Sequence, residues 1–408
     1  MRIHRRALVG LVLLVALVGA VVIRLGTAGA DPGLRTVAVG TNPQAVAVDA
    51  HSHHVFVATY TGSVSVLDAY SGAILRRIAL ATSTIGGSLT LVVDARTRRV
   101  FVVGDNGVVT MVDVDTGGVL RAVHVAAPTL PRRAVGLDEQ AGRLVIVGRR
   151  GTVSVLDART GKIVRAVAVT TPAQGLALAL DTRTGYAFVG GDAGVMSILD
   201  TGTGKIVHTS RILTPFSSFI RVAVAQTSRR VFLANEADFS VSMFDARTGL
   251  LLRTVPVAAF PVDLAVDEHT GHVFVLSQGN GGHGTVSMLN ARSGAVLATT
   301  YVGGAPIALA VDERSGRAFV TGAGDGADRK AGVQPVDGMY AWLAHTSATW
   351  LTHQDTGHVT VLDTRSDAVL RIVAVGQGPS AVAVDAGAGR VVVANFNGGS
   401  VSLLDATR

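Results

Sequence analysis

Three short patterns of apolar and polar residues recur in a fixed order along the chain. The first is an apolar segment that ends in Asp, as in AVAVD at 45–49, and the second is a β-branched segment such as HVFVA at 54–58. The third is represented by VSVLD at 64–68, in which polar and apolar residues alternate. Short alternating or continuous apolar segments are typical of β-strands, whereas an amphipathic helix has a period of about 3.6 residues. Each copy of the three patterns therefore predicts three successive strands.

The third pattern occurs eight times at a nearly constant spacing. The residue that closes it lies at positions 68, 113, 157, 200, 245, 290, 363 and 405, so the interval is 42 to 45 residues in all cases but one. A fourth apolar segment follows most copies, as in ILRRIAL at 74–80, after a turn such as DARTG at 157–161. In such a turn the Asp side chain can accept backbone hydrogen bonds, and the Gly can adopt a positive φ. Four antiparallel strands in each period of about 40–45 residues predict the blades of a β-propeller.

The two ends of the chain complete the count of blades. The last repeat stops at VSLLDATR, residues 401–408, without a fourth strand, and a fourth-strand segment, LRTVAVG, stands alone at 34–40. Pairing of these two segments would close the ring and remove unpaired sheet edges. We therefore predict an all-β fold. It is a single β-propeller of eight four-stranded antiparallel blades, spanning residues 31–408 and closed by its N-terminal strand.

The segments VVVANFNGGSVSLLD at 391–405 and VFVATYTGSVSVLD at 55–68 resemble the YVTN-type β-propeller repeat. In that repeat a valine-rich strand runs into a Tyr-Val-Thr-Asn-like segment and then into a Ser-Val-Ser-Val-aliphatic-Asp strand. The resemblance covers residues 34–408 apart from one insertion. It implies the fold but no single activity, because related propellers include exported binding proteins, surface-layer-associated proteins, lactonases and the haem-binding part of nitrite reductases.

Residues 1–30 have the pattern of an export segment. Three arginines precede an apolar run of 17 residues at 7–23, and AGA at 28–30 has the A-x-A form of a cleavage site. The run is also just long enough to span a bilayer, so the segment is either a signal peptide or an N-terminal membrane anchor. In both cases the remaining chain is extracytoplasmic, which means secreted, periplasmic or at the cell surface. We expect contact with a membrane only through this segment.

Composition limits the classes of partner and site. The chain contains no cysteine, which excludes disulfides, thiolate zinc sites and thiol nucleophiles. The net charge of +7 falls to +3 without residues 1–30, because that segment holds four arginines and no acid. So small a charge gives no strong signal for nucleic acid. We expect a monomer whose partner is a protein or a small-molecule ligand.

The connections of a propeller sort onto two faces. The connections from strand 2 to strand 3, and from strand 4 to the next blade, share one face, which here has the irregular sequence. Irregular loops on a rigid scaffold are where binding sites usually lie. One blade brings two arginine pairs to this face, namely Arg132, Arg133, Arg149 and Arg150. Four guanidinium groups could hold a phosphate, a carboxylate or an acidic polymer. The alternative is a solvated face balanced by acids such as Asp105 and Asp192.

The one interval of 73 residues places an insertion at about 323–357, between strands 2 and 3 of the seventh blade. The insertion holds both tryptophans of the chain, Trp342 and Trp350, together with Tyr340. Two interpretations stay open. These aromatic side chains fold back and plug the mouth of the central channel, or they form a contact surface, because Trp and Tyr dominate binding hot spots.

Catalytic and metal-binding motifs are missing from the sequence. It contains no H-E-x-x-H, G-x-S-x-G, P-loop or haem-attachment motif. The histidines of HSHH at 51–54, and His345, His353 and His358 in or beside the insertion, lack a metal-ligand spacing. We therefore predict no metal and no cofactor.

These observations favour an exported, non-catalytic propeller that binds a ligand or a protein through its irregular face. The alternative is a propeller lactonase or hydrolase, whose site at the central channel would be assembled from distant blades. A haem or quinone redox propeller fits less well, because the haem-attachment motif is missing.

Overall fold

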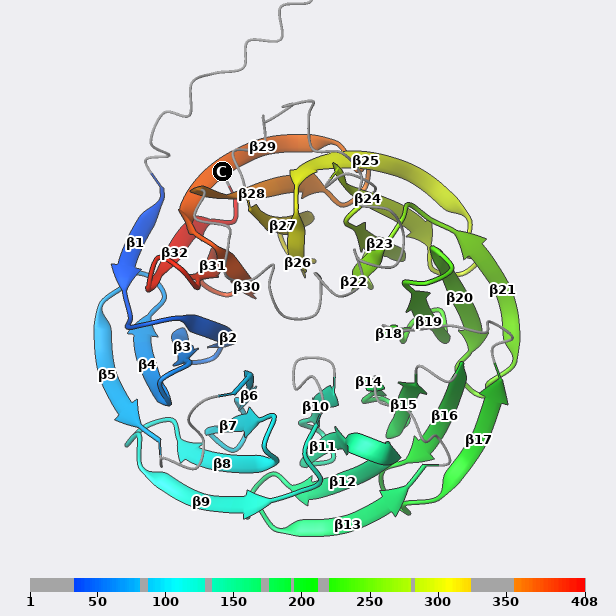
Figure 1. Cartoon of the computed structure of the whole chain (residues 1–408), viewed down its shortest axis with the longest axis horizontal. Coiled ribbons are helices and arrows are strands. Elements are labelled where there is room, and N and C mark those ends of the chain that lie inside the picture. Colours follow the sequence, from blue (N-terminus) through cyan, green and yellow to red (C-terminus); the bar gives the residue numbers. More distant parts are fainter. Residues whose placement is uncertain are drawn as a thin grey trace, which may run out of the picture. The chain divides into compact units, whose positions relative to one another are not determined.

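Each repeat of the sequence forms one antiparallel sheet of four strands, and eight such sheets, the blades, are arranged in a ring (Figure 1). The structure is a computed structural model that describes residues 33–80, 87–128, 134–169, 176–191, 194–211, 220–279, 283–323 and 356–407. Blade 1 contains β2 to β5, and the numbering follows the chain to blade 8, which contains β30, β31, β32 and β1. The predicted all-β propeller of eight four-stranded blades is confirmed.

The position of a strand in its blade sets its distance from the axis of the ring (Figure 1). The innermost strands are β2 (Pro43–Asp49), β6 (Leu89–Asp94), β10 (Val135–Asp138), β14 (Leu176–Asp181), β18 (Ile220–Ala225), β22 (Pro261–Asp267), β26 (Pro306–Asp312) and β30 (Pro379–Asp385). The second strands are β3 (His54–Thr59), β7 (Arg99–Gly104), β11 (Arg143–Gly148), β15 (Tyr186–Gly191), β19 (Arg230–Asn235), β23 (His272–Ser277), β27 (Arg317–Ala323) and β31 (Arg390–Asn395).

The outer half of each blade consists of the third and fourth strands. The third strands are β4 (Ser63–Asp68), β8 (Val108–Asp113), β12 (Thr152–Asp157), β16 (Val195–Asp200), β20 (Ser240–Asp245), β24 (His283–Asn290), β28 (Thr356–Asp363) and β32 (Ser400–Asp405). The outermost strands are β5 (Ile74–Ala79), β9 (Val119–His124), β13 (Ile163–Ala168), β17 (Ile206–Arg211), β21 (Leu251–Pro256), β25 (Val296–Gly304), β29 (Val369–Gln377) and β1 (Arg35–Ala38). A 3₁₀ helix, η2 (Arg149–Gly151), lies between β11 and β12.

The ring closes through the N-terminal strand, as predicted. β1 pairs antiparallel with β32, with Arg35 opposite Leu403 and Ala38 opposite Ser400. The backbone N–H of Val39 then donates to the carbonyl of Gly399 at 3.0 Å, and the Val39 side chain is fully buried. The outer strand of blade 8 therefore comes from the opposite end of the chain.

The hydrophobic core is divided into layers between neighbouring blades. In one layer, Phe56 of blade 1 packs with Leu89 and Val102 of blade 2, and similar clusters lie at the other seams. The second strands supply a recurrent buried aromatic side chain, namely Phe56, Phe101, Phe188, Phe232, Phe274 and Phe319. Burial of one such side chain contributes about 1.5–3 kcal/mol, so each blade depends on its neighbours for stability.

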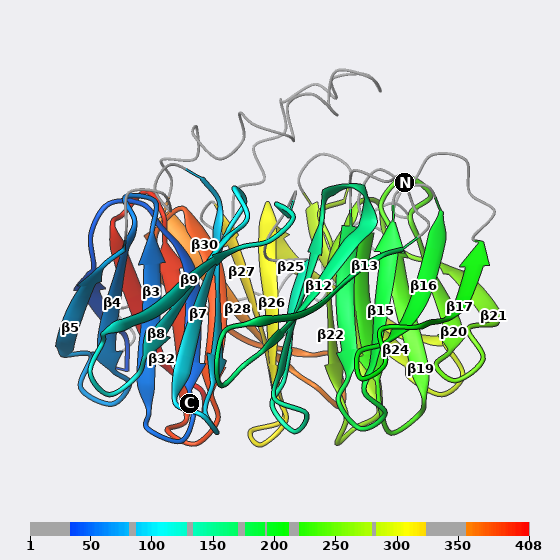
Figure 2. The ribbon, with the colours of Figure 1, turned by 90° about the horizontal axis from the view of Figure 1, so that it is seen from below.

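Two kinds of connection give the ring two different faces (Figure 2). The hairpins from strand 1 to strand 2 and from strand 3 to strand 4 form the turn face. In the hairpin after β12, the Asp157 carboxylate accepts hydrogen bonds from the hydroxyl and the backbone N–H of Thr160, both at 2.7 Å, and Gly161 has a φ of 65°. The bond from the Thr160 hydroxyl is the largest cause that lowers the pKa of Asp157. The remaining connections, from strand 2 to strand 3 and from strand 4 to the next blade, form the loop face.

Two predictions about segments have no structural description. The predicted insertion falls between β27 and β28, and its residues 324–355 lie outside the described residues, as do residues 1–32. In the described part of the chain, no helix is long and apolar enough to cross a membrane.

Candidate functional site

The structure describes two of the predicted binding residues, and both lie on the loop face, between β11 and β12. These are Arg149 and Arg150. The others lie outside the described residues, namely Arg132, Arg133, Tyr340, Trp342 and Trp350.

Arg149 and Arg150 are held against the neighbouring blade by the backbone of η2. The N–H of Arg149 donates to the carbonyl of Ala127 at 2.8 Å, in the connection that enters blade 3, and Arg150 has a φ of 62°. This approach requires Gly148, because a Cβ there would lie 2.4 Å from a backbone oxygen of the same connection. The sequence around the arginine pair thus fixes the position of its main chain.

The side chains of the arginine pair are exposed, and neither forms an ion pair with a described residue. Asp105, one of the acids that could have balanced them, instead accepts a hydrogen bond from the N–H of Ser88 at 2.9 Å. Asp192 is outside the described residues. Arg149 and Arg150 therefore present positive charge and guanidinium donors to solvent, an arrangement suited to carboxylate groups.

A second feature of the loop face, at the seam of blades 5 and 6, was not predicted from the sequence. Phe239 precedes β20 and Phe260 precedes β22, and their rings meet edge to face with centroids 4.9 Å apart. Both rings are half-buried. The carbonyl of Phe239 accepts from Val257 N–H at 2.8 Å, and that of Phe260 accepts from Gln278 N–H at 3.0 Å, so both main chains are fixed.

Both phenylalanines adopt a backbone conformation that bulky residues avoid. Phe239 has a φ of 50° and Phe260 a φ of 57°. A non-glycine residue in such a region costs about 1–3 kcal/mol and persists where the surrounding structure enforces it, often at functional sites. In the other seven repeats the residue at the place of Phe239 is glycine, namely Gly62, Gly107, Gly151, Gly194, Gly284, Gly357 and Gly399. Comparison of the repeats at this single position could have revealed Phe239.

Acidic side chains lie beside the aromatic pair in sequence. Asp238 is exposed and accepts a hydrogen bond from the side-chain amide of Asn235 at 2.8 Å, and Glu236 is half-buried. This part of the loop face therefore combines aromatic surface with negative charge, whereas the arginine pair of blade 3 is positive.

An ion pair links the innermost strands of blades 5 and 6. Arg221 Nε lies 3.5 Å from Asp263 Oδ1 and donates to the carbonyl of Val262 at 2.8 Å. The other carboxylate oxygen of Asp263 accepts from the N–H of Leu309 in blade 7 at 3.1 Å. Most other repeats have alanine at this strand position, so Arg221 and Asp263 also depart from the repeat.

The loop face offers three kinds of contact to a binding partner. These are the guanidinium groups of blade 3, the aromatic pair of blades 5 and 6, and the neighbouring acids. Blade 4 separates the first of these from the other two, so a ligand that uses all three must span several blades, as a protein does. In the described part of the chain, no group of three or more His, Asp or Glu side chains is placed to hold a metal ion.

Comparison with known proteins gives a family model and similar folds. The family model described as outer membrane protein assembly factor BamB matches residues 36–185 of this chain. The chain is similar to BamB-type propellers over that region, which includes Arg149 and Arg150 but not Phe239 or Phe260. No curated protein matches the chain.

Two solved structures share the fold at low sequence identity. BamB from Moraxella catarrhalis is 16% identical, with a TM-score of 0.62 over 91% of this chain and 98% of that one. The computationally designed protein Ika8 is 17% identical, with a TM-score of 0.64 over 90% of this chain and 97% of that one. At these identities the likeness describes the fold alone.

Proposed function

We propose that this chain is an exported, non-catalytic β-propeller that binds a protein partner through its loop face. The observation that carries the proposal is the match of the BamB model to residues 36–185. The description of that family supports a role in the assembly of outer membrane proteins. Arg149 and Arg150 lie inside the matched region, and their exposed side chains have no ion-pair partner among the described residues.

The proposal extends to segments without a structural description. Residues 1–30 would serve as the signal peptide or anchor that brings the ring outside the cytoplasm. Arg132 and Arg133 would enlarge the basic surface of blade 3. Tyr340, Trp342 and Trp350 would contact the partner from the insertion at 323–357. The motifs at 55–68 and 391–405 support the finer assignment to the YVTN-type repeat, which stays a prediction.

The proposal is tested by site-specific photo-cross-linking in the cells that make the protein. A photoreactive amino acid replaces Arg149 or Asp238 on the loop face and, as matched controls, the exposed Arg159 or Arg183 on the turn face. We expect a discrete cross-linked protein from the loop-face positions only. Equal cross-linking from both faces, or none from either loop-face position, would contradict the proposal.

The alternative function, a lactonase or hydrolase at the central channel, stays open to a direct assay. The ion pair of Arg221 and Asp263 joins two innermost strands, β18 and β22, and is therefore a candidate for such chemistry. A lactone and ester screen of the purified chain, with and without a chelator, compares the parent with Asp263→Asn. Turnover that is lost in the variant would favour the enzyme over the scaffold.

A further inference from the structure

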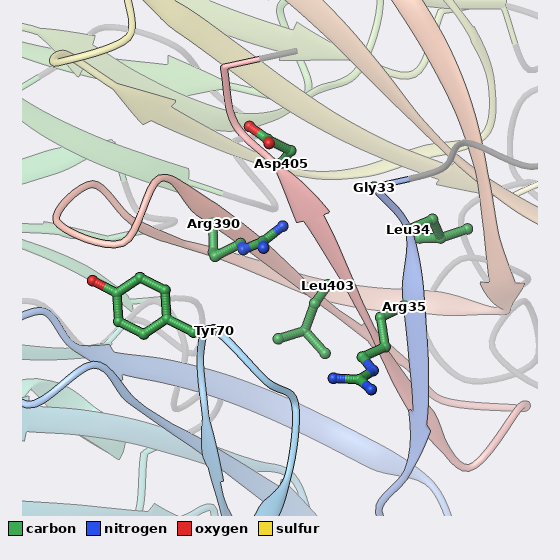
Figure 3. A pocket seen from close by; sticks show the side chains of 7 residues that line it. All are labelled: Gly33, Leu34, Arg35, Tyr70, Arg390, Leu403 and Asp405. Carbon is green, nitrogen blue, oxygen red and sulfur yellow. The ribbon is translucent and has the colours of Figure 1, made fainter.

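Blade 8 differs from the other blades because no hairpin joins its third and fourth strands. β32 ends at Asp405 near the C-terminus, and β1 begins at Arg35 near the other end of the chain. A cavity of about 420 Å³ lies at this seam on the turn face, as Figure 3 shows. It is lined by Gly33, Leu34, Arg35, Tyr70, Arg390, Leu403 and Asp405, and we call it the closure cavity.

Arg35 is one of a recurrent set of outer-strand arginines that share one pairing register, as Arg35 lies opposite Leu403 of β32 and Arg253 lies opposite Met243 of β20. Three equivalents donate a hydrogen bond to a carbonyl in the following blade: Arg76 to Asp115 at 2.6 Å, Arg253 to Ser293 at 3.3 Å and Arg371 to Asp405 at 2.6 Å. Arg35 forms no side-chain hydrogen bond with a described residue, although its stem packs beside Gly72 of blade 1. Its guanidinium group therefore keeps its donors for another acceptor.

Arg390 belongs to a second recurrent set, at the start of the second strand. Arg99 and Arg230 pair within their own blades with Asp113 at 2.6 Å and Asp245 at 3.0 Å. Arg390 lies opposite Asp405 in the same register, yet it forms no ion pair or side-chain hydrogen bond with a described residue. Arg35 and Arg390 thus both lack a side-chain acceptor among the described residues, and both line the closure cavity.

Three of the remaining side chains that line the closure cavity are apolar or aromatic, namely Leu34, Leu403 and Tyr70. Leu403 is 3% exposed, and the ring of Tyr70 is exposed but meets His53 edge on at 5.0 Å. His53 in turn contacts the buried carboxylate of Asp385 at 3.0 Å, which fixes this wall. In Figure 3, Arg390 and Leu403 lie between Tyr70 on one side and Arg35 on the other.

The lining has a net positive charge. It contains two arginines, Arg35 and Arg390, and a single acid, Asp405, which accepts hydrogen bonds from the N–H and the hydroxyl of Thr407 at 2.8 and 2.7 Å. Guanidinium groups bind oxyanions through parallel N–H donors. The volume lies within the range of about 300–1,000 Å³ that is typical of small-molecule sites.

We propose that the closure cavity binds a small organic anion, in which a phosphate or carboxylate group is joined to an apolar or aromatic body. The acidic group contacts Arg35 and Arg390, and the body packs against Leu403 and Tyr70. Because these residues belong to β1, to blade 8 and to blade 1, the ligand joins the closing strand to both of its neighbours. A ligand that binds only the closed ring also stabilises that state.

The test uses the full chain with phenyl phosphate and benzoate as probes, measured by calorimetry and by thermal melting. We expect saturable binding of at least one probe and a higher melting temperature in its presence. The better probe identifies the acidic group. Arg35→Gln or Arg390→Gln should weaken binding by about tenfold or more, because each removes a charged hydrogen-bond donor.

The matched control is Arg253→Gln, since Arg253 holds the same strand position as Arg35 but is already bonded to Ser293. Its affinity for the probe should equal that of the parent. If Arg35→Gln perturbs the fold, as judged by circular dichroism, Arg390→Gln alone decides. Absence of binding by the parent, binding unchanged in the arginine variants, or an equal loss in Arg253→Gln would overturn the proposal.

Discussion

At the scale of single residues, Asp367 differs from the equivalent residue of the other repeats in a way that should destabilise the fold. It stands in the turn after β28 at a place that other blades fill with glycine, has a φ of 59° and is fully buried. At the equivalent residues Gly72, Gly117, Gly161 and Gly204, an added Cβ would lie 2.5–3.0 Å from the Cδ of an arginine in the preceding blade, and the closest approach is that of Arg76 at Gly117. Blade 6 has Ala298 at the arginine position, and this smaller residue leaves room for Asp367.

Burial raises the pKa of Asp367 to about 6, while the Thr300 hydroxyl and His272 act in the opposite direction. Neither carboxylate oxygen accepts a hydrogen bond of normal geometry in the described part of the chain. The folded state therefore binds a proton more tightly than the unfolded state. As the pH rises from about 4 to about 6, ionisation of Asp367 progressively lowers the free energy of unfolding. Above about pH 6 this loss of stability is constant.

Asp367→Gly should therefore stabilise the protein at pH 7, by about 1–3 kcal/mol, because it removes a buried charge and a strained φ. The part of this stabilisation that comes from removing the charge should vanish near pH 4, because Asp367 of the folded parent is protonated there. Denaturant unfolding at pH 4 and pH 7 measures both values. Asp367→Asn is the control that keeps the side-chain shape and the backbone but removes the charge. A gain for Asp367→Gly that is equal at both pH values would mean that strain alone sets the cost.

At the scale of elements, the close approach of two connections positions the arginine pair. η2 can approach the connection that enters blade 3 only because Gly148 lacks a side chain. Gly148 has a φ of −89°, which any residue can adopt. A glycine is therefore required here because a larger side chain would collide with the neighbouring connection, and not because of the backbone conformation. Gly142, which precedes β11, has the opposite requirement. Its φ of 64° favours glycine, whereas an added Cβ would have no atom within 4 Å.

Gly148→Ala should destabilise the ring by about 1–3 kcal/mol, because the methyl group meets backbone atoms that must move. It should also weaken partner binding, since Arg149 and Arg150 move with η2. Gly142→Ala should cost about 1 kcal/mol through its φ alone and leave binding intact. Denaturant unfolding and partner affinity measure the two effects. A Gly148→Ala variant as stable as the parent would contradict this account of η2.

Sequence patterns could predict the elements almost completely, because each repeat repeats the same local signals. The alternating segments gave the strands, the Asp and Gly of DARTG at 157–161 gave the hairpins, and the isolated segment at 34–40 gave the closing strand. The place of Arg149 and Arg150 in the connection between the second and third strands of blade 3 could be predicted from the repeat, and their role in binding stays a prediction. The ion pair of Arg221 and Asp263 could not be predicted, because its partners are about one repeat apart and meet only when two inner strands are neighbours.

At the scale of the whole molecule, stability depends on closure of the ring. β1 is only four residues long, and it is the strand that joins the two ends of the described chain. Val39, directly after it, is fully buried, and burial of a valine contributes about 1.5–3 kcal/mol.

Deletion of residues 34–40 should lower the melting temperature by several degrees and cause self-association, because the free edge of β32 then pairs with other chains. Scanning calorimetry and size-exclusion chromatography measure the two effects. A synthetic peptide of residues 34–40 added in trans should reverse both. A truncated chain that stays monomeric and melts like the parent would show that closure by β1 does not stabilise the ring.

The affinity of the cross-linked partner for charge-reversal variants tests the central claim most directly. Arg149→Glu with Arg150→Glu reverses the loop face of blade 3, and Arg159→Glu with Arg183→Glu makes the same charge change on the turn face. We expect the first pair to weaken binding by at least about tenfold and the second to leave it within about twofold, because few interface residues carry most of the binding energy. Unchanged affinity in the first pair, or an equal loss in both, would contradict a protein-binding scaffold that uses the loop face.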